Sequence, residues 1–336
     1  MKVGIIGATG VLGREIVSAF LDSNELRQEM IGATPPLLLS TGQSVGETFQ
    51  WVEDEELIVE LYSPEAARGL DVALLAIPAA SVAPIAGRLR ELGITTIDAS
   101  SAFRSSAPLF FDEASKPVNL SGAALVALPS PESLALARVL RALEPFEPVG
   151  VRATILKAAS GAGQAGVNDL AEGTGRLLNG QEPENPLHGH RLAFNLIPQA
   201  GAFVGAETQS EVDLANDLPR LLGHSLATTA TIGWGPWFFG DFFSLSLRFA
   251  ATVDAESIRG RLSDRPHLKV VDDVTNLVYP MPSLATGDDA VLVGRLRPDP
   301  LDRQGFQLVA AMDGARAAAA HAVEAFWAVA RARRAH

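Results

Sequence analysis

Three glycines at three-residue spacing follow the first apolar run of the chain and could hold a phosphate group. The run is Val3 to Ile6, and Gly7, Gly10 and Gly13 come after it. Glycines let the backbone approach a pyrophosphate, and the free N–H groups at the start of a following helix stabilise its charge. The spacing is GxxGxxG and not the commoner GxGxxG, so a plain strand-to-helix turn is the alternative. The turn predicts a dinucleotide site made by Gly7, Thr9, Gly10, Val11 and Gly13.

Two further segments place polar side chains where a ligand would be bound. Asp98 to Arg104 follows an apolar run, and loops at the carboxyl ends of parallel strands carry ligand contacts. Arg104 is therefore a candidate for holding an anion, with a solvated surface arginine as the alternative. Ser40 and Thr41 follow a second apolar run, where the adenosine ribose of a cofactor would lie. No acid stands there to accept from a 2′-hydroxyl, and no arginine to hold a 2′-phosphate.

The elements that must position these residues alternate between strand and helix. Apolar runs predict strands at 3–6, 37–39, 71–77, 94–97 and 125–128, and helices are expected at 14–21 and 81–92. This order predicts an α/β fold with a parallel, doubly wound sheet. The segment Ser130-Pro131-Glu132-Ser133 then opens another helix, with serine as N-cap and proline in the first turn.

The second half of the chain predicts longer strands. These strands, several of which alternate apolar and polar residues, are expected at 149–156, 225–232, 243–251, 290–297 and 306–312. Helices are expected at 167–178 and 315–332. A mostly antiparallel sheet with one or two helices is the expected second domain. The alanine-rich last helix is expected to return and pack on the first domain.

Composition excludes several classes of function. The chain has 336 residues, a net charge of -12 and no basic stripe, which argues against nucleic-acid binding. It has no cysteine, so a disulfide, a thiolate metal site and a cysteine nucleophile are excluded. The longest charge-free run, 72–87, contains Pro78 and Pro84 and predicts no membrane span. A strand beginning at residue 3 leaves no room for a signal peptide, and a cytoplasmic protein is expected.

The histidines and a group of aromatic residues have structural and functional interpretations. His188 and His190 share a loop but lack a third ligand at fixed spacing, so no metal site is predicted. His321 is expected to be a partly buried packing residue. The aromatic residues between 234 and 243 are expected to pack in the core or at a dimer contact, with the lining of a substrate pocket as the alternative.

Six separated stretches resemble the aspartate-β-semialdehyde dehydrogenase family, in the order of that family. They are Gly7 to Gly13, Ile97 to Arg104, Ala159 to Gly163, Ala193 to Gln199, Tyr279 to Pro282 and Val293 to Arg297. The resemblance implies an NAD(P)-binding Rossmann-like domain at 1–129 and 313–336, and an α+β dimerisation domain at 130–312. It also implies cofactor contacts from Ser160, Gly161 and Gly163.

In this family a cysteine thiolate attacks the aldehyde, a histidine moves the proton, and an arginine and a glutamine hold the substrate. Hydride then passes to NADP, and phosphate releases the acyl group. Here the cysteine slot falls on Ser130, Pro131, Glu132 or Ser133. By the same alignment, Asp241 takes the place of the histidine, Trp234 of the arginine and Lys157 of the glutamine. Arg220 matches a family segment that carries a lysine.

These losses resemble the cysteine-poor, degenerate Usg branch of the family. They imply a homodimer that lacks the parent activity. Its fold would still be of the type that binds NADP or NAD. An active oxidoreductase on another substrate and a structural partner of an active dehydrogenase are the alternatives. A nucleophile and base made by Ser133 and Asp241 is disfavoured, because an aspartate pKa of about 3.9 makes a poor base at pH 7. We expect Trp234 to fill part of the pocket, and Asp241 to pair with Lys157 or Arg220 or to face water.

Overall fold

The chain folds into two units, seen in a computed structural model. The structure describes residues 1–336 except 24–34, 43, 52–54, 114–119, 121, 185 and 335–336, so that Gln43 and Asn185 lie outside it. One unit comprises residues 1–130 with 318–336, and the other comprises residues 131–317. In the described part of the chain, no helix is both long and apolar enough to cross a bilayer.

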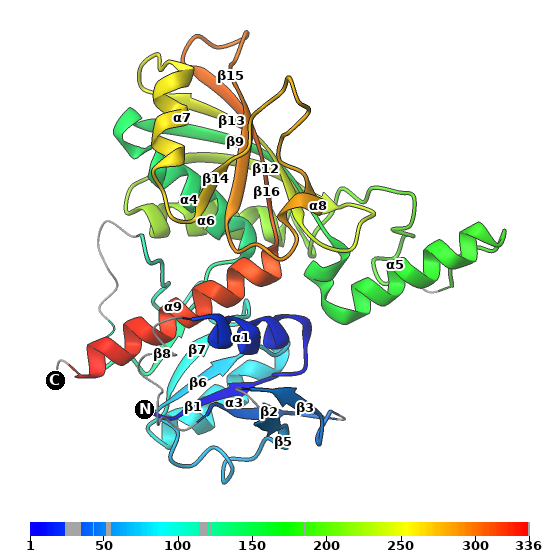
Figure 1. The fold of residues 1–336 in the computed structure, drawn as a ribbon, viewed down its shortest axis with the longest axis vertical. Helices are drawn as coiled ribbons and strands as arrows, with labels where there is room; N and C mark the ends of the chain where they lie inside the picture. Colours follow the sequence, from blue (N-terminus) through cyan, green and yellow to red (C-terminus); the bar gives the residue numbers. More distant parts are fainter. Residues whose placement is uncertain are drawn as a thin grey trace. The chain divides into compact units, whose positions relative to one another are not determined.

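The first unit is built on a six-stranded sheet whose ladders are all parallel (Figure 1). Its order is β5 (Glu60–Leu61), β2 (Leu37–Ser40), β1 (Val3–Ile6), β6 (Val72–Leu75), β7 (Thr95–Asp98) and β8 (Leu125–Ala127). The residues of β1, β6 and β7 are buried throughout, as expected of strands covered on both faces. The helices α1 (Val11–Asp22) and α3 (Ala79–Glu91) and a hairpin of β3 (Thr48–Gln50) and β4 (Glu56–Ile58) complete this part. The predicted parallel sheet is confirmed.

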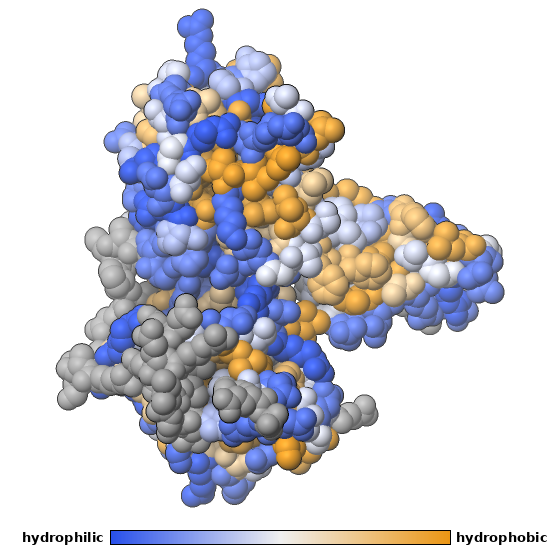
Figure 2. Space-filling view, in the orientation of Figure 1, coloured by the Kyte–Doolittle hydropathy of each residue, from blue (hydrophilic) through white to orange (hydrophobic). Residues whose placement is uncertain are grey.

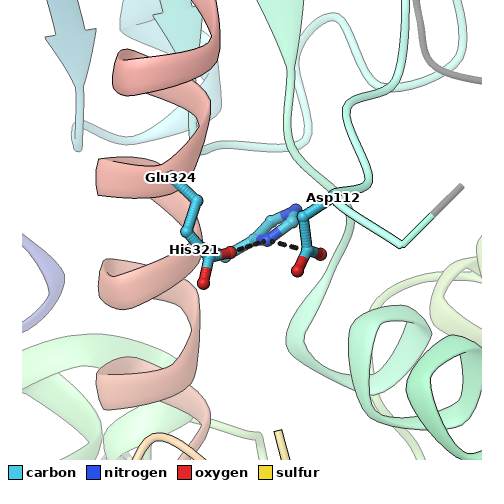
Figure 3. Close-up of side chains that lie close together, drawn as sticks. All are labelled: Asp112, His321 and Glu324. Carbon is cyan, nitrogen blue, oxygen red and sulfur yellow. Dashed lines mark hydrogen bonds and ion pairs between the residues drawn. The ribbon is translucent and has the colours of Figure 1, made fainter. Parts of the chain in front are cut away.

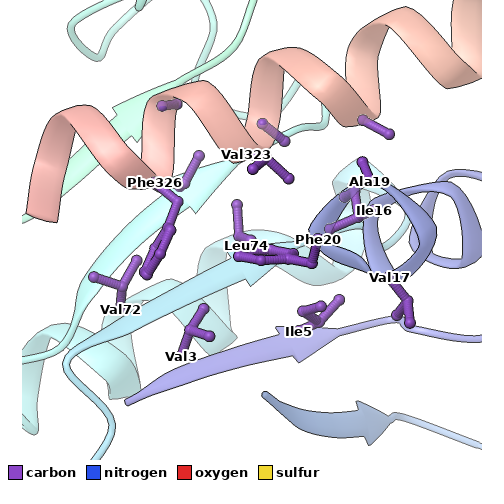
Figure 4. Close-up of a cluster of buried hydrophobic side chains, with 14 of the residues drawn as sticks. Val3, Ile5, Ile16, Val17, Ala19, Phe20, Val72, Leu74, Val323 and Phe326 are labelled. Atoms are coloured by element: carbon purple, nitrogen blue, oxygen red, sulfur yellow. The ribbon is translucent and has the colours of Figure 1, made fainter. Parts of the chain in front are cut away.

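The C-terminal helix α9 (Gly314–Arg334) contributes its residues from 318 onward to the core of the first unit. Small alanines at 319, 322 and 325 are fully buried, which lets the helix backbone approach the sheet and α1 closely. Phe326 packs edge-on against Phe20 of α1, with ring centroids 5.3 Å apart (Figure 4). The predicted terminal helix is therefore present and shares a core with the first strands.

The second unit contains a six-stranded mixed sheet. Its order is β12 (Ala227–Trp234), β9 (Pro148–Lys157), β13 (Asp241–Phe249), β16 (Gly305–Met312), β15 (Val291–Pro298) and β14 (Leu268–Val270). The three central ladders are antiparallel and the two outer ones are parallel. A small pair of β10 (Phe203–Val204) and β11 (Glu207–Thr208) lies outside this sheet.

Helices are more numerous in this unit than the sequence predicted. They are α4 (Pro131–Ala142), α5 (Gly163–Leu178), α6 (Gln209–Leu222), α7 (Ala255–Ser263) and the short α8 (Pro282–Ala285), with 3-10 turns at Glu144–Phe146 and Ala159–Ala162. The expectation of one or two helices is wrong. Helix α6, which the sequence did not predict, begins with a capping box between Thr208 and Glu211 and contains Pro219 in its last turn.

Candidate functional site

The glycine turn of the first unit has the geometry of a close approach to a ligand. Gly7 has a φ of 92°, a left-handed conformation that favours glycine. A Cβ at Gly13 would lie 2.0 Å from the Gly7 carbonyl oxygen, so only glycine fits there. Gly10 caps α1 without a side-chain hydrogen bond, which leaves the N–H groups of the first helical turn open to an anion.

Arg14, which the sequence analysis did not single out, lies in the first turns of α1 and contacts the glycine loop. Its Nε donates to the Thr9 carbonyl oxygen at 3.0 Å, and its Nη2 pairs with Glu47 at 2.5 Å. Ser40, at the end of β2, accepts a hydrogen bond from the Gly42 N–H through its Oγ. Thr41 beside it is exposed. These contacts hold the turn and the end of β2, and the cofactor roles of Ser40 and Thr41 stay predictions.

The loop after β7 is fixed by the fully buried Asp98. Its two carboxylate oxygens accept the N–H groups of Ser100 at 2.8 Å and Phe103 at 3.1 Å. Arg104 donates to the carbonyl oxygens of Leu128 at 3.2 Å and Ser100 at 3.3 Å. These backbone contacts orient the guanidinium, and its anion-binding role stays a prediction.

In the second unit, an ion pair joins the start of α4 to the end of β9. Glu132 lies in the first turn of α4, and its Oε1 accepts from the Nζ of Lys157. The side chains are 3% and 15% exposed, so both charges are largely removed from water. A charge buried to this degree must be paired, because an unpaired one costs several kcal/mol. The sequence named both residues as site candidates but did not predict that they pair.

Trp234 lies at the end of β12 and brings two further side chains together. The Lys157 Nζ lies 5.4 Å from the centroid of its ring, and the imidazole of His188 stacks on it at 4.6 Å. Burial lowers the pKa of His188, so this imidazole is neutral at pH 7. A Cβ at Gly161 would lie only 3.1 Å from the indole, which therefore rests against the loop after β9. His188 belongs to this cluster, and its position in a loop gave no periodic signal of that.

Backbone N–H groups of the loop after β9 donate hydrogen bonds to other residues of the second unit. The N–H of Ala158 donates to the Oδ1 of Asp241 at 2.7 Å. The N–H groups of Ala159 and Ser160 donate to the carbonyl oxygens of Trp237 and Phe238. The turn between β12 and β13 thus holds this loop, while Phe238 and Phe239 point partly to solvent at 41% and 42% exposure. The aromatic residues of this segment therefore do not form one packed core.

Asp241 is 4% exposed and is not paired as the sequence predicted. Lys157 pairs with Glu132, Arg220 lies 3.8 Å from Asp217, and the Asp241 carboxylate accepts a backbone N–H. Burial raises the pKa of Asp241 to about 7, against the opposing effect of the Lys157 charge. The Glu132 carboxylate raises it further. The expectation that Asp241 pairs with a cation or faces water is wrong, and the carboxyl group is instead half-protonated near neutral pH.

Ser133 follows Glu132 in α4 and is fully buried. Its hydroxyl donates to the Oδ2 of Asp217 at 3.1 Å, so it links α4 to α6. The Ser133 hydroxyl thus contacts Asp217, whereas the Asp241 carboxylate accepts from Ala158, and the structure does not support the disfavoured Ser133–Asp241 pair. Of the candidates in this unit, the structure thus brings Glu132, Lys157, Trp234 and Asp241 to one end of the sheet and places Arg220 beside Asp217.

The raised pKa of Asp241 predicts a pH-dependent cost to folding. An acid that ionises at about 3.8 when unfolded and about 7 when folded binds fewer protons in the unfolded state, so its contribution falls as pH rises across this window. At about 1.4 kcal/mol for each pH unit, the full effect is about 4 kcal/mol. Asp241→Asn, which keeps the acceptor for Ala158, is expected to gain stability relative to the parent chain between pH 4 and pH 7. Urea unfolding at several pH values measures this, and parallel curves for the two proteins would contradict it.

Comparison with known proteins places this arrangement in a family. The model of the semialdehyde dehydrogenase NAD binding domain matches residues 2–133, and the model of the semialdehyde dehydrogenase dimerisation domain matches residues 140–316. The aspartate-semialdehyde dehydrogenase of Mycolicibacterium smegmatis is 31% identical over 348 residues, which cover 95% of this chain and 96% of that protein. That of Bacillus subtilis (strain 168) is also 31% identical, over 92% of this chain and 91% of its own length.

Solved structures agree with these matches. The probable aspartate-semialdehyde dehydrogenase from Pseudomonas aeruginosa superimposes with a TM-score of 0.84 at 27% identity, over 96% of each chain. Aspartate semialdehyde dehydrogenase II from Vibrio cholerae, complexed with ASA, gives a TM-score of 0.84 at 25% identity over 98% of this chain and 97% of that one. The chain therefore belongs to the semialdehyde dehydrogenase family, with the NAD-binding and dimerisation domains of that family.

Proposed function

We propose that this chain keeps the dinucleotide-binding fold of its family but does not perform the thiol-dependent, phosphorylating dehydrogenation of aspartate semialdehyde. In this respect it resembles the cysteine-poor, degenerate Usg branch. One observation carries the proposal. Glu132 is one of the four positions on which the cysteine slot falls, and Lys157 takes the place of the glutamine; the two form a buried ion pair in a chain without cysteine.

Each group that the reaction needs is replaced by one that cannot do the same work. A thiolate is both a nucleophile and an acyl leaving group, whereas the Glu132 carboxylate is already paired with Lys157. Trp234 offers no guanidinium for bidentate pairing with a substrate carboxylate. Asp241 is buried and accepts from the Ala158 N–H, where the family has a proton-transferring histidine. These contacts support the proposal that the side chains of this site stabilise the fold through an ion pair and a hydrogen bond and do not react with a substrate.

The test is turnover with aspartate semialdehyde, phosphate and NADP, followed as NADPH absorbance. The parent chain is expected to give the rate of the protein-free control. Single substitutions to cysteine at each position from 130 to 133 are also expected to stay inactive, because the carboxylate clamp and the proton-transferring histidine are still missing. Glu132→Cys additionally leaves the Lys157 ammonium without its buried partner. Family-like turnover by the parent chain or by any one of these variants would contradict the proposal.

A second candidate function is favoured by the near-neutral pKa of Asp241. A group that ionises near pH 7 is suited to general acid catalysis, and a bound nicotinamide cofactor supplies hydride transfer. The glycine turn fits such a cofactor, since Gly7 and Gly13 admit a close backbone approach and the start of α1 carries no side-chain cap. This second candidate is the reduction of a different carbonyl substrate, without a covalent step. The burial of Asp241 makes this the weaker candidate.

Titration with NAD, NADP and their reduced forms tests whether the glycine turn still binds a dinucleotide. We expect a rise in melting temperature that Gly10→Ala weakens, because a methyl group there has room in the fold but obstructs the pyrophosphate. The added Cβ would lie 3.6 Å from the Gly7 carbonyl oxygen, an ordinary contact. Gly87→Ala, whose Cβ meets nothing within 4 Å, is the matched control. The absence of a shift with all four nucleotides would remove the second candidate and leave a structural role.

We further propose that the chain forms a homodimer through its second unit. The match to a dimerisation domain supports this, as do exposed apolar side chains of that unit. Figure 2 shows apolar surface along the arm that contains α5. Leu178, Phe194, Phe203 and Leu277 are between 61% and 74% exposed. Light scattering is expected to give twice the chain mass of 35.4 kDa. A monomer would contradict the dimer, and stoichiometric co-purification with an active dehydrogenase would favour the alternative of hetero-pairing.

A further inference from the structure

Three side chains of metal-ligand type meet in the first unit, away from the glycine turn (Figure 3). His321 and Glu324 lie one turn apart on α9, and Asp112 lies in the loop that follows Phe110 and Phe111. The His321 Nδ1 is 2.9 Å from the Oε2 of Glu324 and 3.5 Å from the Oδ1 of Asp112. The histidine is 1% exposed, so its ring is held in place and directed at the two carboxylates.

The contact of the other ring nitrogen fixes where the imidazole carries its hydrogen. The His321 Nε2 lies 3.2 Å from the Phe110 carbonyl oxygen, and a carbonyl only accepts, so Nε2 carries the hydrogen. In a neutral imidazole, Nδ1 is then a lone pair that faces two carboxylates. Among the described residues, the three polar atoms that contact the His321 ring are all acceptors. The arrangement calls for a cation at Nδ1, which is either a proton or a metal ion.

The donor set favours a metal ion over a proton. Metal-bound histidines commonly donate their second N–H to a backbone carbonyl, as His321 does to Phe110. A proton on Nδ1 needs one carboxylate, whereas two converge here within 4.8 Å of one another. One imidazole and two carboxylates suit zinc, whose tetrahedral site would keep a fourth position for water. The Asp112 side chain is 20% exposed and gives the ion a path from solvent.

We propose that Asp112, His321 and Glu324 bind a divalent transition-metal ion, with Zn²⁺ as the best match. The sequence predicts no metal site, because His188 and His190 lack a third ligand at fixed spacing and Asp112 lies far from His321 along the chain. The ion would link α9 to the loop after Phe110, within a unit whose core this helix helps to form. Metal binding is therefore expected to stabilise the fold, since it adds an interaction absent from the unfolded chain.

The full chain, freed of metal with EDTA and dialysed, is titrated with ZnCl₂ by calorimetry and by thermal melting. We expect one ion per chain and a higher melting temperature. Asp112→Asn and Glu324→Gln keep the shape of each ligand but remove its charge, and each is expected to weaken zinc binding by at least about tenfold. His190→Gln and Glu60→Gln, both at exposed positions, are matched controls and should bind as the parent chain does.

Two outcomes would overturn the proposal. The first is the absence of zinc uptake at millimolar ZnCl₂ by a chain that melts cooperatively, which would assign a proton to Nδ1. The second is uptake that Asp112→Asn and Glu324→Gln leave unchanged, or that His190→Gln abolishes, which would place the ion at surface histidines. Circular dichroism and melting in EDTA show whether each variant is folded before it is titrated, so a loss of binding is not confused with a loss of structure.

Discussion

The buried ion pair between Glu132 and Lys157 sets the conditions for the rest of the second unit's candidate site. The amino end of α4 favours a negative charge, and the first turn of this helix holds the Glu132 carboxylate. The same property of a helix end would stabilise a thiolate. A carboxylate there needs a cation, and Lys157 at the end of β9 provides it. Glu132, one of the four positions on which the cysteine slot falls, is thus half of an ion pair.

The charges of this ion pair act on the neighbouring side chains of Asp241 and Trp234. The Glu132 charge adds to the burial that raises the pKa of Asp241, and the Lys157 charge limits the rise. The Lys157 ammonium also lies over the indole of Trp234, which is a favourable cation–π contact. An arginine at position 234 has no aromatic ring and could not make this contact. Gly161 leaves room for the indole of Trp234. The Asp241 carboxylate accepts the Ala158 N–H and so holds the start of the loop that contains Gly161. Glu132, Lys157, Trp234 and Asp241 therefore form a mutually supporting set within one unit.

The sequence predicted the parts of this protein that depend on local pattern. The continuous apolar run Val72–Leu75 and the alternating Asp241–Phe249 have residue patterns that are typical of strands. Helix α6 was missed because Asn216, Asp217 and Pro219 suggest a loop, although tertiary packing buries Leu218 and Leu221. Apolar pattern thus outweighs propensity where a helix can bury one face.

The contacts of the candidate site were less predictable, because they join residues from separate elements. Glu132 and Lys157 were each identified from the family resemblance, but their contact depends on how α4 meets the end of β9. The stacking of His188 on Trp234 depends on the path of a loop that has no periodicity. The raised pKa of Asp241 follows from burial, which residue type alone does not reveal. Spacing identifies an element, whereas the partners of a buried charge become known only from the fold.

We infer that the buried Glu132–Lys157 pair serves structure and not catalysis. A double-mutant cycle of Glu132→Leu, Lys157→Met and the two together, measured by urea unfolding, tests this most directly. Removing one partner of a structural buried pair is expected to cost about 3–5 kcal/mol, and the double variant should recover most of that loss. Catalytic groups often reduce stability, so their removal tends to raise it. If each single substitution stabilised the fold, the pair would be a retained functional site, and its structural role would be contradicted.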